Sequence, residues 1–451
     1  MTTAVEAAQS EFAALVGATR VVADSAVCAA LSVDGRTPRY AVYPTSPEQV
    51  AAVLRCAADH DLAVIPCRSV TKLGVGNLPR RYDVALSLKE LNHVWHYEPA
   101  DLTVTAEAGM RFGDFQQFVG RDGLWLPLDP PGGPRGSLGG ILATNASGPL
   151  RLFYGAPRDV VVGMKIATPE GKIIKTGGRV VKNVAGYDMA KLLIGSYGTL
   201  GVIVEASFKL FPLPSERATF VLPAGTLGIA RDLRCRILCS PLQPMRMVLL
   251  DAVAANLAVA GTPLARVVTE PEVWVEMGGS GRVLERCARE LDELGKAAGA
   301  AACHQEAENA DIAWARVSDF RTWLPEAFPG GAILKVALPD AACEEFLSRA
   351  QQEAENDKVR LASFCQLGVG ILHACLLEAA SAVGLVALIR RLRKAAQDLG
   401  GALVVEHCHW DVKSRVDVWG TTGDDLTVMA KVKAAWDPKG TLAPGRFVGG
   451  L

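Results

Sequence analysis

Three loops of small residues are the feature that most constrains how this 451-residue chain can fold. They are Arg68–Gly74, Gly136–Gly140 with Ala143–Asn145, and Gly195–Gly201, and each directly follows a segment typical of a β-strand. Successive backbone N–H groups can hold a diphosphate where no side chain blocks their approach, and glycine or serine permits that approach. Each loop alone is equally typical of an ordinary turn. Three of them in one half of the chain predict a site that wraps one long ligand.

The common sequence motifs for nucleotide binding are absent. No G-x-G-x-x-G follows a predicted strand and no G-x-x-x-x-G-K-[ST] occurs, so Rossmann and P-loop sites are excluded. Lys and Arg (47) balance Asp and Glu (48), which argues against a nucleic-acid partner. The 11 cysteines include no C-x-x-C pair, so we expect reduced, buried thiols and no iron–sulfur cluster in this chain.

Hydrophobic periodicity predicts an α+β chain with two domains. Residues 39–66 are predicted to form a β-α-β unit with parallel strands, whose helix begins near Ser46 and Pro47. Glycines crowd residues 132–201, and Phe211–Pro214 then interrupts regular structure before the composition becomes alanine-rich. We therefore predict a helical lead-in over residues 1–35, a first domain over 36–215 and a second over 216–451. Further helices are predicted at 281–300, 381–399 and 424–436, and strands at 273–275, 333–338, 362–377 and 403–405.

Nothing in the sequence predicts export or a membrane span. Residues 1–20 carry Glu6 and Glu11 where a signal peptide has basic residues followed by an apolar stretch. The longest uncharged run, Leu361–Leu377, contains Gln366 and His373 and is shorter than the roughly 20 apolar residues that a bilayer span needs. We expect no transmembrane segment and a cytoplasmic location.

Several segments resemble one family of flavoproteins. The segment from Lys182 to Asp188, followed by Leu193–Ile203, and the C-terminal segment from Asp437 to Arg446 are similar to the FAD-binding (PCMH-type) family of vanillyl-alcohol oxidase and p-cresol methylhydroxylase. Within it, they resemble the glycolate oxidase and D-lactate dehydrogenase branch. Arg446 and the Val418–Gly420 segment are similar to the FAD-binding subunit of glycolate oxidase. The resemblance implies a two-domain PCMH-type fold, with an α+β cap domain whose C-terminal segment returns to the flavin.

The resemblance also assigns FAD contacts. In this family the first loop holds the pyrophosphate, the second approaches the phosphates and the flavin, and further residues line the ribityl, ring and adenosine regions. Carried onto this sequence, the cofactor-binding residues are Arg68, Ser69, Val70, Thr71, Lys72, Leu73, Gly136, Ser137, Leu138, Gly139, Gly140, Asn145, Ser147, Gly148, Gly198 and Ile203.

The first loop departs from the family pattern in two ways. It has Ser69 and Thr71 where relatives have glycines, and their side chains narrow the path by which the phosphates approach the loop. The positive charge of Lys72 can compensate for this narrower approach. It contains no histidine, so we expect FAD to be held noncovalently. Replacing Gly139 with valine is expected to lower FAD occupancy more than it disturbs folding.

The metal site of the 2-hydroxy-acid branch is incomplete in this sequence. The resemblance implies H-x-G-D-G-N-x-H on one strand and an E-H pair on another. Here the first motif runs from Gln366 to His373, with Val369 for the Asp and Ile371 for the Asn, and the second is Glu406–His407. One imidazole and one carboxylate are too few ligands for a metal unless His409 also faces inward. We therefore predict no metal, and poor oxidation of glycolate or D-lactate by the chain alone.

The candidate catalytic residue is His407, assisted by Glu406 or Arg446. A neutral histidine suits the role of accepting a hydroxyl proton near neutral pH. A histidine in an apolar strand is also typical of a packed structural residue, and both interpretations stay open for His407 and for His373.

The resemblance implies the FAD-binding subunit of a glycolate oxidase-type complex. It would oxidise a small 2-hydroxy acid to the 2-oxo acid and pass electrons to an iron–sulfur subunit, beside a sister FAD subunit. Contact with the inner membrane would come through these partners. One alternative is a stand-alone FAD-dependent D-2-hydroxy-acid dehydrogenase. Another is a flavin-binding structural or electron-relay subunit without turnover of its own.

Overall fold

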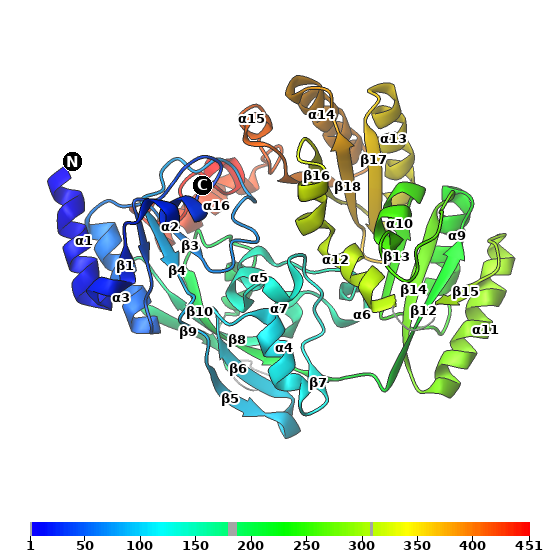
Figure 1. Cartoon of the computed structure of the whole chain (residues 1–451), viewed down its shortest axis with the longest axis horizontal. Helices are drawn as coiled ribbons and strands as arrows, with labels where there is room; N and C mark the ends of the chain where they lie inside the picture. The colour runs from blue at the N-terminus through cyan, green and yellow to red at the C-terminus, as the bar shows by residue number, and fades with distance from the viewer. Residues whose placement is uncertain (1, 179–186, 307–309) are drawn as a thin grey trace.

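The computed structural model describes residues 2–178, 187–306 and 310–451, which form two β-rich bodies lying side by side (Figure 1). The expected α+β class is confirmed by the mixture of helices and strands in both bodies. The predicted boundary near residue 215 falls between the last strand of the first body, β11 (Phe211–Pro212), and the first strand of the second, β12 (Glu216–Pro223).

The first body begins with a four-stranded sheet in the order β1-β2-β4-β3. The predicted helix near Ser46 is α3, capped by Ser46 Oγ, which accepts a hydrogen bond from Gln49 N at 3.2 Å. Its flanking strands β2 and β3 are not neighbours, because both pair in parallel with β4, which lies between them. The elements are α1 (Thr2–Val16), β1 (Val21–Val22), α2 (Ser25–Ala30), β2 (Tyr40–Val42), α3 (Pro47–Asp59), β3 (Val64–Cys67) and β4 (Val84–Ser87). The segment before residue 36, expected to be helical, thus also supplies the edge strand β1.

A five-stranded antiparallel sheet in the order β5-β6-β10-β8-β9 completes the first body, with a small β11-β7 pair beside it. Its elements are β5 (Val94–Glu98), β6 (Thr103–Glu107), α4 (Phe112–Gly120), β7 (Leu124–Trp125), α5 (Leu138–Thr144), α6 (Arg151–Tyr154), α7 (Pro157–Val160), β8 (Val161–Ala167), β9 (Ile173–Gly177), α8 (Ala190–Leu193) and β10 (Val202–Lys209). One hydrophobic core joins both sheets, and α3 and α5 pack into it.

The second body is one eight-stranded sheet in the order β15-β12-β14-β13-β17-β18-β16-β19. Its further elements are α9 (Leu227–Leu238), β13 (Arg246–Leu250), α10 (Ala252–Val259), β14 (Glu272–Gly279), α11 (Gly281–Ala298), β15 (His304–Glu306), α12 (Ala310–Ala327), β16 (Ala332–Ala337), α13 (Cys343–Asn356), β17 (Arg360–Gln366), β18 (Ile371–Glu378), α14 (Ala382–Asp398), β19 (Ala402–His407), α15 (Trp410–Lys413) and α16 (Asp425–Trp436). The region predicted as strand over 362–377 is the β17–β18 hairpin.

Different helices pack on the two faces of the eight-stranded sheet. Helices α9, α11, α13 and α14 pack on one face, and α10 and α12 pack on the other. Because side chains alternate along a strand, Leu372 and Ala374 face the first set, while Cys375 and His373 face the α12 side. In Figure 1, α12 lies between this sheet and the first body. The α12 side of the sheet is therefore the one that meets the first body.

The C-terminal segment returns to the first body. Val64 N donates to Thr441 O at 2.8 Å and Ala443 N donates to Val64 O at 2.9 Å, so this segment runs parallel to β3. In Figure 1 the red helix α16 lies beside the blue strands of the first sheet. Residues 441–446 are thereby brought next to the loop that follows β3.

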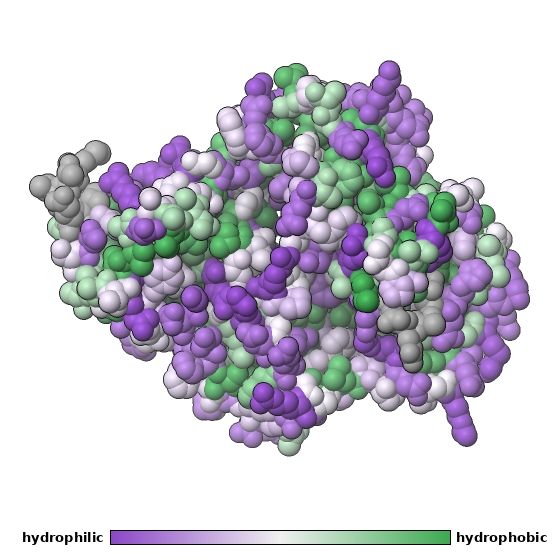
Figure 2. Space-filling model, in the orientation of Figure 1, coloured by the Kyte–Doolittle hydropathy of each residue, from purple (hydrophilic) through white to green (hydrophobic). Residues whose placement is uncertain are grey.

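The visible surface is mostly polar. Figure 2 shows hydrophilic residues spread over this face, with smaller apolar areas among them. None of the helices in the described parts of the chain is both long and apolar enough to cross a bilayer.

Candidate active site

The three small-residue loops meet around one pocket of about 910 Å³, which we call the first pocket. Residues from all three loops, from β10 and from the C-terminal segment line it. Of the predicted cofactor contacts, the following lie in its wall: Arg68, Ser69, Val70, Thr71, Lys72, Leu73, Ser137, Gly139, Gly140, Gly198 and Ile203.

The first loop offers a row of unused hydrogen-bond donors. The backbone N–H groups of Ser69, Val70, Thr71 and Lys72 have no acceptor among the described residues. Val70 adopts a positive φ of 60°, which lets successive N–H groups turn toward a common centre. Such a concave set of N–H groups suits a pyrophosphate, so the loop fits FAD despite having Ser69 and Thr71 in place of glycines.

Arg446 fixes this loop from the C-terminal side. Its Nη2 donates to the carbonyl oxygens of Leu73 and Val75. Its Nη1 is buried and has no partner among the described residues, while the side chain lines the first pocket. An unpartnered buried N–H group is costly unless a ligand accepts from it, so this atom also fits an anionic cofactor. Arg446 lines the first pocket and not the one that contains His407, and its expected role beside that histidine stays a prediction.

The second loop is only partly exposed to the first pocket. Leu138 is 1% exposed in the core and Gly136 does not line the pocket. A Cβ on Gly139 would lie 2.9 Å from Ala108 Cβ and 3.0 Å from Ala108 O, so this glycine allows α5 to pack on the end of β6. This packing argues against the expectation that valine at Gly139 lowers FAD occupancy more than it disturbs folding. A Cβ on Gly140 would meet only Ser137 Oγ, at 3.1 Å.

The remaining predicted cofactor residues lie elsewhere or outside the described residues. Asn145 ends α5 with φ 45° and does not line the first pocket, although its Oδ1 is buried without a partner among the described residues. Ser147 and Gly148 line a different pocket, the third. The segment 182–186, part of the most specific resemblance, lies outside the described residues.

A second pocket of about 460 Å³ lies where the first loop meets α12 and the end of β19. Lys72 reaches it from the first loop, Arg321 from α12, and Glu406 and His407 from β19. Neighbouring strand residues normally point to opposite faces. Here Ile333 pairs with His407 and Leu334 with Val405, so Glu406 is the extra residue of a β-bulge. The bulge brings both Glu406 and His407 to the same pocket.

The charges in the second pocket depend on one another. Arg321 Nε lies 3.0 Å from Glu406 Oε2. Burial raises the pKa of Glu406, but Arg321 and His373 outweigh it and hold that pKa well below its usual value. Burial and then the charge of Arg321 lower the pKa of Lys72 to about 7. Burial, Lys413 and Arg321 lower the pKa of His407 to about 4. Near neutral pH the pocket thus contains a carboxylate, a neutral imidazole and at least one permanent cation.

The third pocket, of about 290 Å³, has His373 in its wall and is mostly apolar. Phe320 and Phe364 line it, together with Gln366 and His373. The Phe320 and His373 rings pack edge to face at 4.8 Å. His409 does not join this group, because it is exposed and caps α15, its Nδ1 accepting from Asp411 N at 3.3 Å. It cannot supply the missing metal ligand.

Arg321 is a site residue that sequence reasoning missed. The feature that could have indicated it is the position of this arginine next to the buried face of a helix. Val317, Phe320 and Leu324 of α12 form that buried face. An arginine in that position must find a partner, and here the partner is Glu406.

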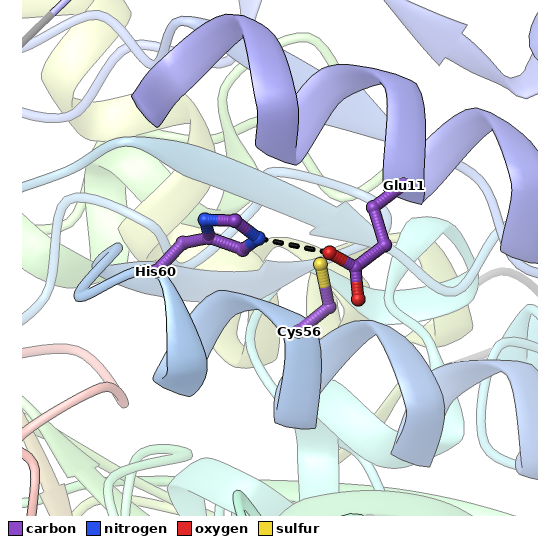
Figure 3. Close-up of side chains that lie close together, drawn as sticks. All are labelled: Glu11, Cys56 and His60. Carbon is purple, nitrogen blue, oxygen red and sulfur yellow. Dashed lines mark hydrogen bonds and ion pairs between the residues drawn. The ribbon is translucent and has the colours of Figure 1, made fainter. Parts of the chain in front are cut away.

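Among the described residues, one group has three potential metal ligands: Glu11 of α1, Cys56 of α3 and His60, the residue directly after α3 (Figure 3). His60 Nε2 and Glu11 Oε2 already pair at 2.9 Å. Burial and Glu11 raise the pKa of the Cys56 thiol to about 12, so it is protonated. None of the three lines the pockets above. We interpret the group as a contact that fixes α1 on α3.

Comparison with known proteins agrees with this geometry. The family described as "FAD binding domain" matches residues 38–177, and the family "FAD linked oxidases, C-terminal domain" matches residues 213–447. The glycolate oxidase subunit GlcD of Bacillus subtilis is 26% identical over 91% of this chain and 90% of its own length. The D-2-hydroxyglutarate dehydrogenase of Xanthomonas citri is 29% identical over 90% of this chain and 88% of its own.

Solved structures show the same fold. Substrate-bound p-cresol methylhydroxylase superposes with a TM-score of 0.81 at 15% identity, covering 99% of this chain and 97% of that one. The alkyldihydroxyacetonephosphate synthase structure gives 0.75 at 16% identity, covering 98% and 86%. The expected PCMH-type fold and FAD as the cofactor are confirmed. The chain belongs to the FAD-linked oxidases, and it is a FAD-dependent oxidoreductase.

Proposed function

We propose that this chain oxidises a small 2-hydroxy acid to the 2-oxo acid with noncovalently bound FAD. The observation that carries the proposal is the second pocket, which combines the cation Arg321 with the neutral base His407 beside the loop suited to the pyrophosphate. The cation suits a substrate carboxylate and the imidazole suits a substrate hydroxyl. The names of the relatives, which include glycolate, D-lactate and D-2-hydroxyglutarate enzymes, support the same substrate class.

The proposed reaction removes two electrons and two protons from the substrate. FAD, when bound, supplies the acceptor for the hydride that leaves C2. His407 takes the hydroxyl proton, because its lowered pKa keeps it unprotonated at neutral pH. Glu406 holds Arg321 in place at 3.0 Å. The protein thereby orients the carboxylate and removes the proton, which leaves a carbonyl at C2.

Noncovalent attachment is supported by the composition of the first pocket. Its described lining contains no histidine, and its single cysteine, Cys67, is buried with its pKa raised to about 12. A protonated thiol is a poor nucleophile toward a flavin. Acid precipitation should therefore release the yellow colour into the supernatant, and a yellow pellet would contradict this part of the proposal.

We also propose that the chain works beside a sister FAD subunit and an iron–sulfur subunit, as in a glycolate oxidase complex. The likeness to a protein named a glycolate oxidase subunit supports this arrangement. The alternative of a stand-alone D-2-hydroxy-acid dehydrogenase is supported by relatives named D-lactate dehydrogenase and D-2-hydroxyglutarate dehydrogenase. Co-purification of the tagged chain with an iron–sulfur protein would favour the complex, and full turnover with a dye acceptor by the chain alone would favour the alternative.

The decisive experiment is anaerobic reduction of the bound flavin by glycolate, D-lactate and D-2-hydroxyglutarate. We expect one or more of them to bleach the flavin absorbance of the wild type. Replacing His407 with Asn should slow this step about 10²- to 10⁴-fold, the usual contribution of a general base. The matched control is His409→Asn, because His409 is exposed and asparagine also caps helices. Equal rates in His407→Asn and the wild type would remove His407 from the reaction.

A further inference from the structure

Three of the motif positions from which the family resemblance implies a metal site, Gln366, His373 and Glu406, come together in this chain without forming one. His373 Nε2 lies 3.6 Å from Glu406 Oε2, and Gln366 lines the third pocket with His373. Gln366 Oε1 and His373 Nδ1 are buried without hydrogen-bond partners among the described residues. An amide, one imidazole and one carboxylate that is already paired with Arg321 are a poor donor set for a divalent cation.

A cation of the protein itself is present at this place. The Arg321 side chain is 13% exposed and approaches Glu406 from α12, the helix that covers this side of the sheet. Its Nε lies 3.0 Å from Glu406 Oε2, whereas His373 Nε2 lies 3.6 Å from the same oxygen. A buried carboxylate requires a positive partner, and the guanidinium supplies the charge that a metal ion would otherwise bring.

The other end of the guanidinium is available to a ligand. Nη1 and Nη2 of Arg321 make no hydrogen bond to any described residue, and the side chain lines the second pocket. A guanidinium has two parallel N–H directions that match the two oxygens of a carboxylate. Lys72 lines the same pocket and adds positive charge. The pocket thus presents Arg321, joined by Lys72 when that lysine is protonated, to an incoming anion while Glu406 stays neutralised.

We infer that Arg321 takes the place of the divalent cation in this chain, neutralising Glu406 through Nε and holding the substrate carboxylate through Nη1 and Nη2. This inference rests on the proposed function for the identity of the substrate. It also removes the reason to expect poor activity from the eroded metal motif, because the lost ligands Gln366, Val369 and Ile371 would be compensated by one arginine.

The test measures metal content and anion binding rather than turnover alone. Oxalate is the probe, because it has two carboxylates and no hydrogen at C2 to lose. The purified FAD-loaded wild type should contain substoichiometric metal by elemental analysis, and EDTA should not change its oxalate affinity by calorimetry. Stoichiometric metal, with oxalate affinity lost after EDTA treatment, would overturn the inference.

Variants of Arg321 give the second readout. Arg321→Met should weaken oxalate binding roughly 10- to 100-fold, as expected for loss of charge-assisted hydrogen bonds. Arg321→Lys should lose less oxalate affinity than Arg321→Met, because the ammonium keeps the positive charge. It should still lose some affinity, because one ammonium cannot bind Glu406 and the ligand at the same time. The control Arg349→Met removes an exposed arginine of α13, on the opposite face of the sheet, and should bind oxalate like the wild type. Wild-type affinity in Arg321→Met would overturn the inference.

Loss of Arg321 alone leaves Glu406 buried and unpaired, which can prevent folding. Arg321→Met combined with Glu406→Gln removes both charges and should show the same loss of oxalate affinity; wild-type affinity there also contradicts the inference. The two proposals fail in different ways. If no 2-hydroxy acid reduces the wild-type flavin, the proposed function fails, even where oxalate binding still depends on Arg321.

Discussion

Lys413 and Asp34 form a buried ion pair in which Lys413 Nζ lies 2.9 Å from both carboxylate oxygens of Asp34. Lys413 is the last residue of α15, the helix that follows β19, and its side chain is 2% exposed. The same Nζ donates to the carbonyl oxygen of Gly74 at the end of the first loop. One lysine therefore ties the segment that carries His407 to the first loop and to the N-terminal part of the chain.

The first prediction concerns the stability that this pair provides. Lys413→Met should lower the free energy of unfolding by about 3–5 kcal/mol, because it leaves Asp34 buried and unpaired. Lys439→Met, which breaks an ion pair with Asp59 that is more than half exposed, should cost less than about 1 kcal/mol. Chemical denaturation of both variants checks the difference. Equal losses would show that the Lys413–Asp34 pair has no special structural role.

The second prediction concerns the pH dependence of His407. Its pKa is lowered to about 4 by burial and then by Lys413, and a general base acts only when unprotonated. Flavin reduction should therefore rise with pH through about 4 and then stay level with respect to this group. Lys413→Met removes a neighbouring positive charge and leaves Asp34, so the pKa of His407 should increase and the rise should move to higher pH. Stopped-flow reduction across pH 4–8 measures the shift, and an unmoved profile contradicts it.

The third prediction separates two adjacent glycines of the second loop. Gly140→Val places its side chain toward the first pocket, where a Cβ meets only Ser137 Oγ, so the variant should fold but lose FAD. Gly139→Val forces a branched side chain against Ala108 and should destabilise the protein itself. The ratio of FAD to protein, and the thermal unfolding midpoint of the FAD-free form, distinguish the two. Retention of FAD by Gly140→Val would show that the second loop does not approach the cofactor.

Local features of the fold were predictable from sequence, and long-range ones were not. Ser46 and Pro47 mark the start of α3 because capping depends on neighbouring residues alone. The insertion of β4 between β2 and β3 depends on pairing partners distant in sequence, which periodicity does not contain. Likewise, the loop residues of the first pocket could be predicted from the sequence, because small residues leave the backbone N–H groups of their own loop accessible.

The charged site illustrates the same limit. His373 lies in β18 and Glu406 in β19, and β16 lies between these strands, yet their side chains approach to 3.6 Å. The E-H pair was visible in the sequence, but the bulge that turns both residues to one pocket was not. Arg321 carries no motif, and only the packing of α12 on the sheet brings it to Glu406. Its role could not be inferred before the helix was placed.

The last prediction concerns Lys72 and the pH dependence of anion binding. Burial and Arg321 lower the pKa of Lys72 to about 7, so below this pH two cations face the second pocket and above it only Arg321 does. A bound anion favours the protonated lysine, so the oxalate affinity should fall as pH rises above about 7, by at most roughly tenfold per pH unit.

Two variants isolate this effect. Lys72→Met should bind oxalate more weakly at pH 6 and should lose the slope above pH 7, because no titrating ammonium remains. Lys72→Arg should keep the affinity at pH 6 and also lose the slope, because a guanidinium stays charged throughout this range. Oxalate titrations by calorimetry between pH 6 and pH 9 measure both quantities. A slope that persists in both variants would assign the pH dependence to another group and leave Arg321 as the cation that binds the carboxylate.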